Sequence, residues 1–343
     1  MSDIDINKLT SYLESNVAGF KGPITLEKFP GGQSNPTFKV VAQSGTYVLR
    51  RQPPGKLLKS AHAVDREYRV LDALRDTNVP VAKVYHLCRD TEILGSMFYL
   101  MEFCDGRVFW SASLKELPDN TQRTAIYDAM NKTLVALHSV DIEAIGLTDY
   151  GKPGNYFERQ LTRWAQQYRA SELTKIDAMD KLIIWLDSHQ PEDDGRVTLA
   201  HGDYRLDNMM FHPDNPEIIA VLDWELSTLG HPFADLAYQC MGLRMPQGLG
   251  SIDGLQNVDR GSLGIPTEEQ YVAKYCARMG IDTIDNWTFY LAFSFFRLAS
   301  IAQGVAKRAK DGNASNKEAG KVGAFVEPLA TMALEIITNQ PNN

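Results

Sequence analysis

The stretch HGDYRLDN, residues 201–208, is the most informative part of this sequence, and Asp223 follows Asp203 by twenty positions within LDWE, residues 222–225. This order of a carboxylate, an amide and a second carboxylate after an apolar run is typical of phosphoryl-transfer enzymes. In that chemistry one carboxylate accepts the proton of the attacking hydroxyl, while amide and carboxylate oxygens hold Mg²⁺. We therefore predict Asp203 as the general base and Asn208 and Asp223 as metal ligands. The alternative is a hydrogen-bonded turn capped by Asp203 and Asn208.

The sequence before residue 104 predicts a small sheet with helices. An amphipathic helix is expected first, because apolar residues recur at helical spacing from Ile6 to Val17. Short β-prone runs bounded by Gly and Pro then predict five strands, interrupted by a helix over residues 61–75. The five expected strands cover residues 24–29, 37–42, 46–51, 81–87 and 97–103.

After Asp105-Gly106 the pattern changes to long helical periods. The expected helices cover residues 121–139, 156–170, 179–189, 268–279 and 286–310, with a further one from about residue 317. Three short strands are expected near the HGDYRLDN stretch, over residues 196–201, 209–211 and 218–223. The fold class is therefore α+β, with an N-terminal lobe over residues 1–103 and a larger, mostly helical lobe over residues 104–343.

Composition narrows the class of protein. With 35 Lys and Arg against 43 Asp and Glu, the net charge is −8, which argues against nucleic acid as a partner. The four cysteines lie far apart without metal-ligand spacing, and the N-terminus lacks the layout of a signal peptide. The apolar run 289–306 is interrupted by Arg297 and Gln303, which favours a buried helix over a membrane span. We expect a cytoplasmic protein with no membrane partner.

The motif resembles the aminoglycoside phosphotransferase and choline kinase-like superfamily, in which HGDxxxxN precedes an Asp-Trp or Asp-Phe pair. Three further stretches resemble the kinase-like domain that is fused to acyl-CoA dehydrogenases in some proteins. These are YVLRRQPPG at residues 47–55, SAHAVDRE at 60–67 and GKPGNY at 151–156. The resemblance implies a protein kinase-like fold of two lobes, with ATP and Mg²⁺ as cofactors.

The resemblance assigns the nucleotide to the N-terminal lobe. Gly31 to Asn35 lie between two expected strands, where backbone N–H groups of Gly32, Gln33, Ser34 and Asn35 would cover the phosphates. Arg50 stands where most kinases place a phosphate-binding Lys, and Glu67 is its expected partner. Because alternation in a strand sends Arg50 and Arg51 to opposite faces, Arg51 remains the alternative.

Four further residues receive roles from the resemblance. The carbonyl of Glu102 and the N–H of Cys104 would pair with adenine, although the run 98–106 alone is an ordinary apolar strand and turn. Asp235 would brace the catalytic loop by accepting backbone hydrogen bonds. His201 is expected to serve packing and hydrogen bonding and not acid–base chemistry.

The acceptor is expected to be the hydroxyl of a small molecule. A protein kinase is disfavoured because Asp-Trp-Glu replaces Asp-Phe-Gly and no Ala-Pro-Glu follows. The segment between residues 289 and 323 contains six basic residues and only two acidic ones. This positive excess suits an anionic acceptor such as a hydroxy acid or hydroxyacyl thioester. A solvated helix face explains the same excess. An aminoglycoside- or choline-type kinase and a non-catalytic nucleotide-binding pseudokinase stay open, as do GTP as donor and the oligomeric state.

Overall fold

The computed structural model describes residues 4–29, 35–53, 62–248, 254–312 and 319–339. The chain separates into two units. The first comprises Met1–Arg107, Ala144–Leu147 and Met209–Leu226, and the second comprises Val108–Glu143, Thr148–Asn208 and Ser227–Asn343. Residues 209–226, which follow the HGDYRLDN stretch, thus belong to the same unit as the N-terminal sheet, a grouping that the sequence alone did not indicate.

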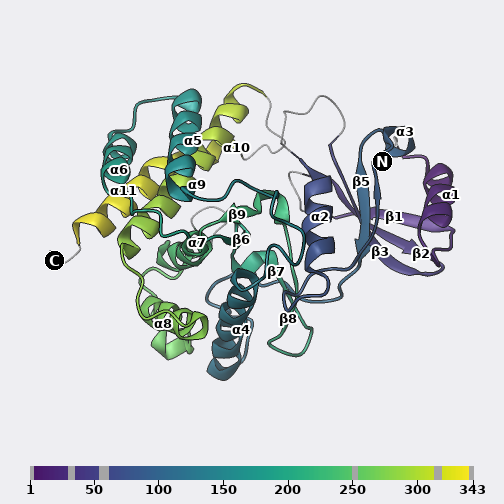
Figure 1. Ribbon diagram of the computed structural model, residues 1–343, viewed down its shortest axis with the longest axis horizontal. Helices are drawn as coiled ribbons and strands as arrows, with labels where there is room; N and C mark the ends of the chain where they lie inside the picture. Colours follow the sequence, from purple (N-terminus) through teal and green to yellow (C-terminus); the bar gives the residue numbers. More distant parts are fainter. Residues whose placement is uncertain (1–3, 30–34, 54–61, 249–253, 313–318, 340–343) are drawn as a thin grey trace. The chain divides into compact units, whose positions relative to one another are not determined.

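An antiparallel sheet of five strands organises the first unit (Figure 1). Its spatial order is β1-β2-β3-β5-β4, and each neighbouring pair is antiparallel. The strands are β1 (Ile24–Lys28), β2 (Thr37–Ala42), β3 (Gly45–Arg51), β4 (Val84–Cys88) and β5 (Phe98–Glu102). All five strands predicted from the β-prone runs are present.

Alternation along β3 gives the sheet two different faces. Leu49 belongs to a buried apolar cluster with Leu9 and Leu13 of α1 (Ile6–Asn16) and Leu94 of α3 (Thr91–Leu94). Helix α2 (Val64–Leu74) packs against β4 and β5, and the Arg50 side chain reaches it. The period of two therefore sends consecutive side chains of one strand toward different helices.

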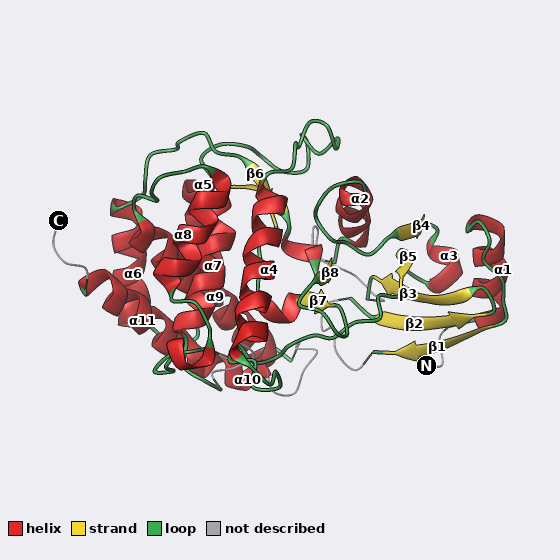
Figure 2. Ribbon diagram, turned by 90° about the horizontal axis from the view of Figure 1, so that it is seen from below, coloured by secondary structure: helices red, strands yellow, loops and turns green. Residues whose placement is uncertain are grey.

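Helices make up most of the second unit (Figure 2). The long helix α9 packs against α5, α6, α7, α10 and α11, and α4 packs against α8. The bounds are α4 (Asn120–His138), α5 (Tyr156–Ser171), α6 (Asp177–Ser188), α7 (Pro232–Arg244), α8 (Glu268–Met279), α9 (Trp287–Lys310), α10 (Ala319–Val322) and α11 (Val326–Thr338).

Helix α9 is long and apolar enough to cross a membrane, judged by length and composition alone. However, 78% of its most apolar 18 residues are buried inside the protein. The prediction of a buried helix over residues 289–306 is therefore confirmed.

Two short antiparallel strand pairs, one in each unit, are separate from the five-stranded sheet. In the second unit β6 (Thr198–Ala200) pairs with β9 (Thr228–Gly230) just before the HGDYRLDN residues. In the first unit β7 (Met209–Phe211) pairs with β8 (Ile218–Val221), which ends two residues before Asp223. The sequence predicted β6, β7 and β8 within a few residues and missed β9, a strand of three residues.

Candidate functional site

Arg50 and Glu67 form a buried ion pair in the first unit. Nε of Arg50 lies 2.7 Å from Oε2 of Glu67, and Nη2 lies 3.2 Å from Oε1. The hydroxyl of Tyr99 donates to Oε2 of Glu67 at 3.0 Å, and Nδ2 of Asn35 donates to Oε1 at 2.9 Å. Tyr99 is the cross-strand partner of Arg50, so the sheet register places both side chains on the face that meets α2.

The neighbouring charges favour the protonated form of Arg50. Burial by itself would lower the pKa of Arg50, but the charges of Glu67 and Asp223 raise it above its usual value. The side chain of Glu67 is only 2% exposed, so its oxygens need hydrogen-bond donors from the protein. Asn35, predicted to contact nucleotide through its backbone, directs its side chain to Glu67.

Asp223 is the third member of this group. Its Oδ1 lies 3.0 Å from Nη2 of Arg50. The residue follows β8 and has φ of 60°, a left-handed conformation that a non-glycine residue rarely adopts. Nε1 of Trp224 donates to the carbonyl of Val221 at 2.9 Å and so closes the tight turn around Asp223. The Asp223 side chain is 48% exposed, unlike its buried partners.

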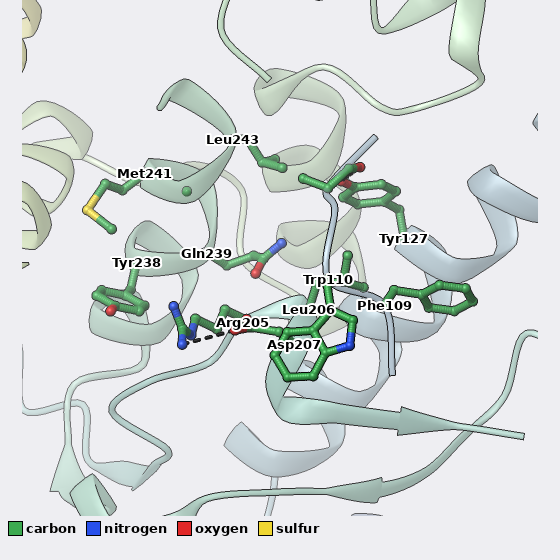
Figure 3. A pocket seen from close by; sticks show the side chains of 12 residues that line it. Phe109, Trp110, Tyr127, Arg205, Leu206, Asp207, Tyr238, Gln239, Met241 and Leu243 are labelled. Carbon is green, nitrogen blue, oxygen red and sulfur yellow. Dashed lines mark hydrogen bonds and ion pairs between the residues drawn. The ribbon is translucent and has the colours of Figure 1, made fainter. Parts of the chain in front are cut away.

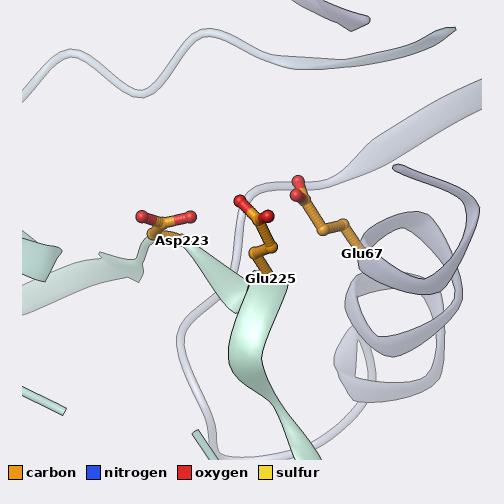
Figure 4. A group of neighbouring side chains, drawn as sticks. All are labelled: Glu67, Asp223 and Glu225. Carbon is orange, nitrogen blue, oxygen red and sulfur yellow. The ribbon is translucent and has the colours of Figure 1, made fainter. Parts of the chain in front are cut away.

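A third carboxylate, Glu225, joins Glu67 and Asp223 (Figure 4). One oxygen from each lies within 4.8 Å of the others, a spacing at which the three could hold a cation. Burial, then the charges of Asp223 and Glu67, raise the pKa of Glu225. The sequence analysis gave Glu225 no role, although an acidic residue two positions after Asp223 was visible.

The structure distinguishes the two arginines of β3. Nη1 of Arg51 donates to the carbonyl of Leu94 at 3.1 Å, on the face opposite Arg50. Arg50 contacts both Glu67 and Asp223. This geometry favours Arg50 for a role beside Asp223.

The structure describes only some of the other residues predicted to bind nucleotide. Gly32, Gln33 and Ser34 lie outside the described residues. Glu102 ends β5, and its backbone N–H donates to the carbonyl of Lys83 at 2.8 Å. Cys104 follows the strand, where burial and then the charge of Glu102 raise the pKa of its thiol to about 11. Their roles toward adenine stay predictions.

In the second unit the motif brings Asp203 and Asn208 together. Nδ2 of Asn208 donates to Oδ2 of Asp203 at 2.8 Å and to the Asp203 carbonyl at 2.9 Å. The short 3₁₀ helix Leu206–Asn208 turns the chain so that these residues, five positions apart, can meet. Because the amide nitrogen is engaged, Oδ1 of Asn208 is the atom that could ligate a cation.

Asp235 fastens the backbone of this loop. Its Oδ2 accepts from the N–H of His201 at 2.6 Å, and its Oδ1 accepts from the N–H of Gly202 at 2.8 Å. Asp235 is 1% exposed and lies in the first turn of α7, where a carboxylate also meets the positive end of the helix. Burial would raise its pKa, but His138, His201 and the Gly202 N–H together lower it.

His201 is fully buried, and its ring contributes to the same loop. Nδ1 accepts from the backbone N–H of Asp203 at 3.2 Å. The ring also packs edge-on against Tyr204, whose hydroxyl donates to the carbonyl of Met130 at 2.7 Å. These contacts hold the loop in shape and are those of a packing and hydrogen-bonding residue.

A pocket lies beside this loop within the second unit (Figure 3). Arg205 contributes to its wall and bonds Asp207 at 3.0 Å, while its Nε lies 3.5 Å from Oδ2 of Asp203. Burial, then the charge of Asp203, raise the pKa of Tyr238, another wall residue. The rest of the lining is mainly apolar or aromatic and includes Phe109, Trp110, Ala112, Leu206, Met241 and Leu243.

The predicted residues thus form two groups. Arg50, Glu67 and Asp223 meet in the first unit, and His201, Asp203, Asn208 and Asp235 meet in the second. A five-stranded antiparallel sheet, a helix-rich second unit and this braced loop define a protein of kinase-like fold. More narrowly, the chain belongs to the phosphotransferase enzyme family, whose model matches residues 25–270.

Two mouse proteins illustrate the closer sequence similarity. Acyl-CoA dehydrogenase family member 10 is 49% identical over 319 residues, which cover 93% of this chain and 30% of that protein. Acyl-CoA dehydrogenase family member 11 is 41% identical over 337 residues, 97% of this chain and 43% of that protein. The chain therefore spans less than half the length of these relatives.

Solved structures support the same family and fold. A Ralstonia eutropha protein classed as an aminoglycoside phosphotransferase is 48% identical, with a TM-score of 0.89 over 98% of this chain and 99% of that one. Choline kinase from Cryptosporidium parvum shares the fold at 13% identity, with a TM-score of 0.64 over 97% of this chain and 96% of that one. An aminoglycoside phosphotransferase solved with ADP and hygromycin B also shares it, at 15% identity and a TM-score of 0.61, over 96% of this chain and 98% of that one.

Proposed function

We propose that this chain is a kinase that transfers the γ-phosphate of ATP, with Mg²⁺, to a hydroxyl group of a small molecule. The observation that carries the proposal is the pairing of Asp203 with Asn208 on a loop whose backbone is fastened by Asp235. Asp203 is the general base, and Asn208 and Asp223 are the metal ligands. Residues 1–103 form the nucleotide-binding lobe, and residues 104–343 form the catalytic and acceptor-binding lobe.

The environment of Asp203 supports its role as a base. The hydrogen bonds from Asn208 fix the carboxylate and its backbone, and Arg205 lies beside Oδ2. A fixed carboxylate can orient an acceptor hydroxyl and accept its proton as the new O–P bond forms. Positioning is the larger part of this chemistry, because phosphoryl transfer needs little covalent participation from the protein.

The donor atoms suit Mg²⁺, which prefers oxygen ligands. Asp223 offers a half-exposed carboxylate with Glu67 and Glu225 nearby, and Asn208 offers its amide oxygen. When bound, the ion would neutralise charge on the phosphates. Asp223 and Asn208 would hold it, while Glu225 adds negative charge close to Asp223.

Arg50 is the proposed phosphate-binding residue, oriented by Glu67 from behind. Its guanidinium already lies against Asp223, so the phosphates and the metal ligand would share one cationic group. Gly32, Gln33, Ser34 and Asn35 would cover the phosphates, and the backbone of Glu102 and Cys104 would pair with adenine. The complex of a fold relative with ADP supports nucleotide binding here.

The proposed acceptor is a hydroxy acid or hydroxyacyl thioester. The support is the similarity to proteins named acyl-CoA dehydrogenase family members 10 and 11, together with the basic excess between residues 289 and 323. A polycationic aminoglycoside would be expected to need several unpaired carboxylates near Asp203. Asp207, the acidic residue of the pocket lining, is instead paired with Arg205. We place this activity in the cytoplasm.

A phosphate-transfer assay tests the proposal. Purified protein with MgATP is offered short hydroxy acids, hydroxyacyl thioesters, an aminoglycoside and choline, and phosphorylated product is measured by mass spectrometry. We expect product with a hydroxy acid or hydroxyacyl thioester. Efficient transfer to the aminoglycoside or to choline alone would contradict the acceptor class. Nucleotide binding without transfer to any acceptor would favour a pseudokinase.

A further inference from the structure

Arg297 is a buried cation for which the described residues supply no anionic partner. It lies in α9 with an exposed fraction of only 7%. Within the described parts of the chain, its guanidinium takes part in no hydrogen bond and no ion pair. Buried arginines are almost always paired, because removal of a charge from water is costly and a guanidinium stays protonated. An unpaired one is therefore a candidate site for an anionic ligand.

Two aromatic rings hold the guanidinium without supplying an acceptor. The Arg297 Cζ atom lies 5.6 Å from the centroid of the Trp164 ring and 5.4 Å from that of Tyr238. Such contacts attract a cation and fix the plane of the guanidinium. The rings accept no N–H hydrogen bond in their planes, so the donors of this oriented group stay available to a ligand or to water.

Two further arginines, Arg159 and Arg163, lie in the neighbourhood of Arg297. Burial raises the pKa of Tyr156, but the charges of Arg297, Arg159 and Arg163 act in the opposite direction. Arg163 also lies over the Trp164 ring, at 5.6 Å. Asp235 is the acidic group whose charge acts on Tyr156. Its oxygens already accept hydrogen bonds from the backbone N–H groups of His201 and Gly202. This part of the second unit therefore favours an anionic ligand.

Tyr238 connects this cation to the proposed general base. Its ring lies over Arg297, while the charge of Asp203 acts on its hydroxyl. The same tyrosine lines the pocket beside the catalytic loop (Figure 3). Tyr238 therefore contacts Arg297 and also lines the pocket beside the loop that carries Asp203.

We propose that Arg297 binds an oxyanion, carboxylate or phosphate, carried by the acceptor whose hydroxyl is presented to Asp203. This inference rests on the proposed function and adds the residue that selects the acceptor. The planar fork of a guanidinium matches both kinds of oxyanion by two parallel hydrogen bonds. Arg297 is one of the six basic residues between 289 and 323 from which the sequence analysis predicted an anionic acceptor.

Calorimetric titrations of the full chain test this site without requiring turnover. The probes are hexanoate, inorganic phosphate and the neutral hexanamide, each with and without MgADP. We expect one oxyanion to bind at least about tenfold more tightly than hexanamide. Preference for hexanoate identifies a carboxylate, and preference for phosphate identifies a phosphate group. Arg297→Gln should abolish the preference.

Matched variants separate a binding role from a structural one. Arg163→Gln removes the exposed cation beside the same tryptophan and should change the preference by less than about twofold. Arg297→Lys keeps the charge without the fork and should weaken oxyanion binding about tenfold, which serves as the test if Arg297→Gln does not fold. Equal binding of oxyanions and hexanamide by the unmodified protein, or an unchanged preference in both Arg297 variants, would overturn the inference.

Two further outcomes distinguish this inference from the proposed function. Replacement of MgADP by a non-hydrolysable ATP analogue should leave the affinity for the oxyanion probe unchanged. Loss of that affinity with the analogue would assign Arg297 to the γ-phosphate and overturn the acceptor role. Failure of the unmodified protein to bind MgADP would overturn the proposed function, whereas the oxyanion preference measured without nucleotide would still support the site.

Discussion

Arg50 and Glu67 are joined by a 2.7 Å ion pair whose side chains are only 13% and 2% exposed. Glu67→Ala leaves the Arg50 guanidinium buried without its main partner, so we expect a loss of about 3 kcal/mol in the free energy of unfolding. Denaturant unfolding followed by circular dichroism measures this loss. Glu27→Ala, an exposed change on β1, is the control and should stay within about 0.5 kcal/mol of the unmodified protein. Equal stability of the two variants would show that the pair does not anchor α2 to the sheet.

Arg50 and Arg51 should differ in their effect on nucleotide use. Arg50→Lys keeps the charge but loses the fork that spans Glu67 and Asp223, so we expect the KM for ATP to rise about tenfold. Arg51→Lys alters a contact with the Leu94 carbonyl on the other face and should change KM less than about twofold. Steady-state kinetics at saturating acceptor decide between them. The reverse order would assign the phosphate contact to Arg51.

Asp223 and Glu225 should control the magnesium requirement to different degrees. Asp223→Asn removes the proposed ligand charge, so the Mg²⁺ concentration for half-maximal rate should rise at least about tenfold. Glu225→Gln removes a neighbouring charge and should have a smaller effect in the same direction. The measurement is the rate as a function of free Mg²⁺ at fixed ATP. An unchanged requirement in Asp223→Asn would remove this residue from the metal site.

Asp235 should make the stability of the second unit depend on pH. Its pKa is lowered in the folded protein, so its contribution is present above the ordinary aspartate value of about 3.9 and is lost as the pH falls through the folded value. Asp235→Asn should cost about 2–4 kcal/mol near pH 7, because an amide cannot accept both backbone hydrogen bonds. The difference from the unmodified protein should shrink below about pH 4.

The measurement for Asp235 is urea unfolding of both proteins between pH 3 and 7. Asp214→Asn, an exposed change in the turn between β7 and β8, controls for the loss of one carboxylate. A stability difference that stays constant over this range would show that the charge of Asp235 is not what holds the His201 and Gly202 backbone.

Local sequence patterns predicted the fold well, because strand and helix periods act over a few residues. The period of two in β3 separated Arg50 from Arg51, and the order of strands and helices indicated an α+β fold of two lobes. The kinase-like class followed from the resemblance of the HGDYRLDN motif. The grouping of residues 209–226 with the N-terminal sheet depends on contacts between distant segments, such as the bond from the Val221 N–H to the Pro80 carbonyl at 2.8 Å. Short patterns carry no signal for such contacts.

The residues of the candidate site that belong to a motif could be predicted from the sequence. The residues that reach the site only through packing between distant segments could not. Asp203, Asn208 and Asp223 stand out by spacing, whereas Tyr99 reaches Glu67 only through the register of β3 and β5. Arg297 was visible as one of several basic residues, but its burial without an anion became apparent only in the structure. Chemical roles for all of these residues stay predictions.

Single-turnover phosphate transfer by Asp203→Asn tests the central claim most directly. With a productive acceptor, we expect the rate to fall roughly 10²–10⁴-fold while MgADP binding stays within about threefold, because the amide keeps the shape of the loop but cannot accept the proton. Asp214→Asn should transfer at the unmodified rate. Transfer by Asp203→Asn at the rate of the unmodified protein would contradict the assignment of Asp203 as the general base.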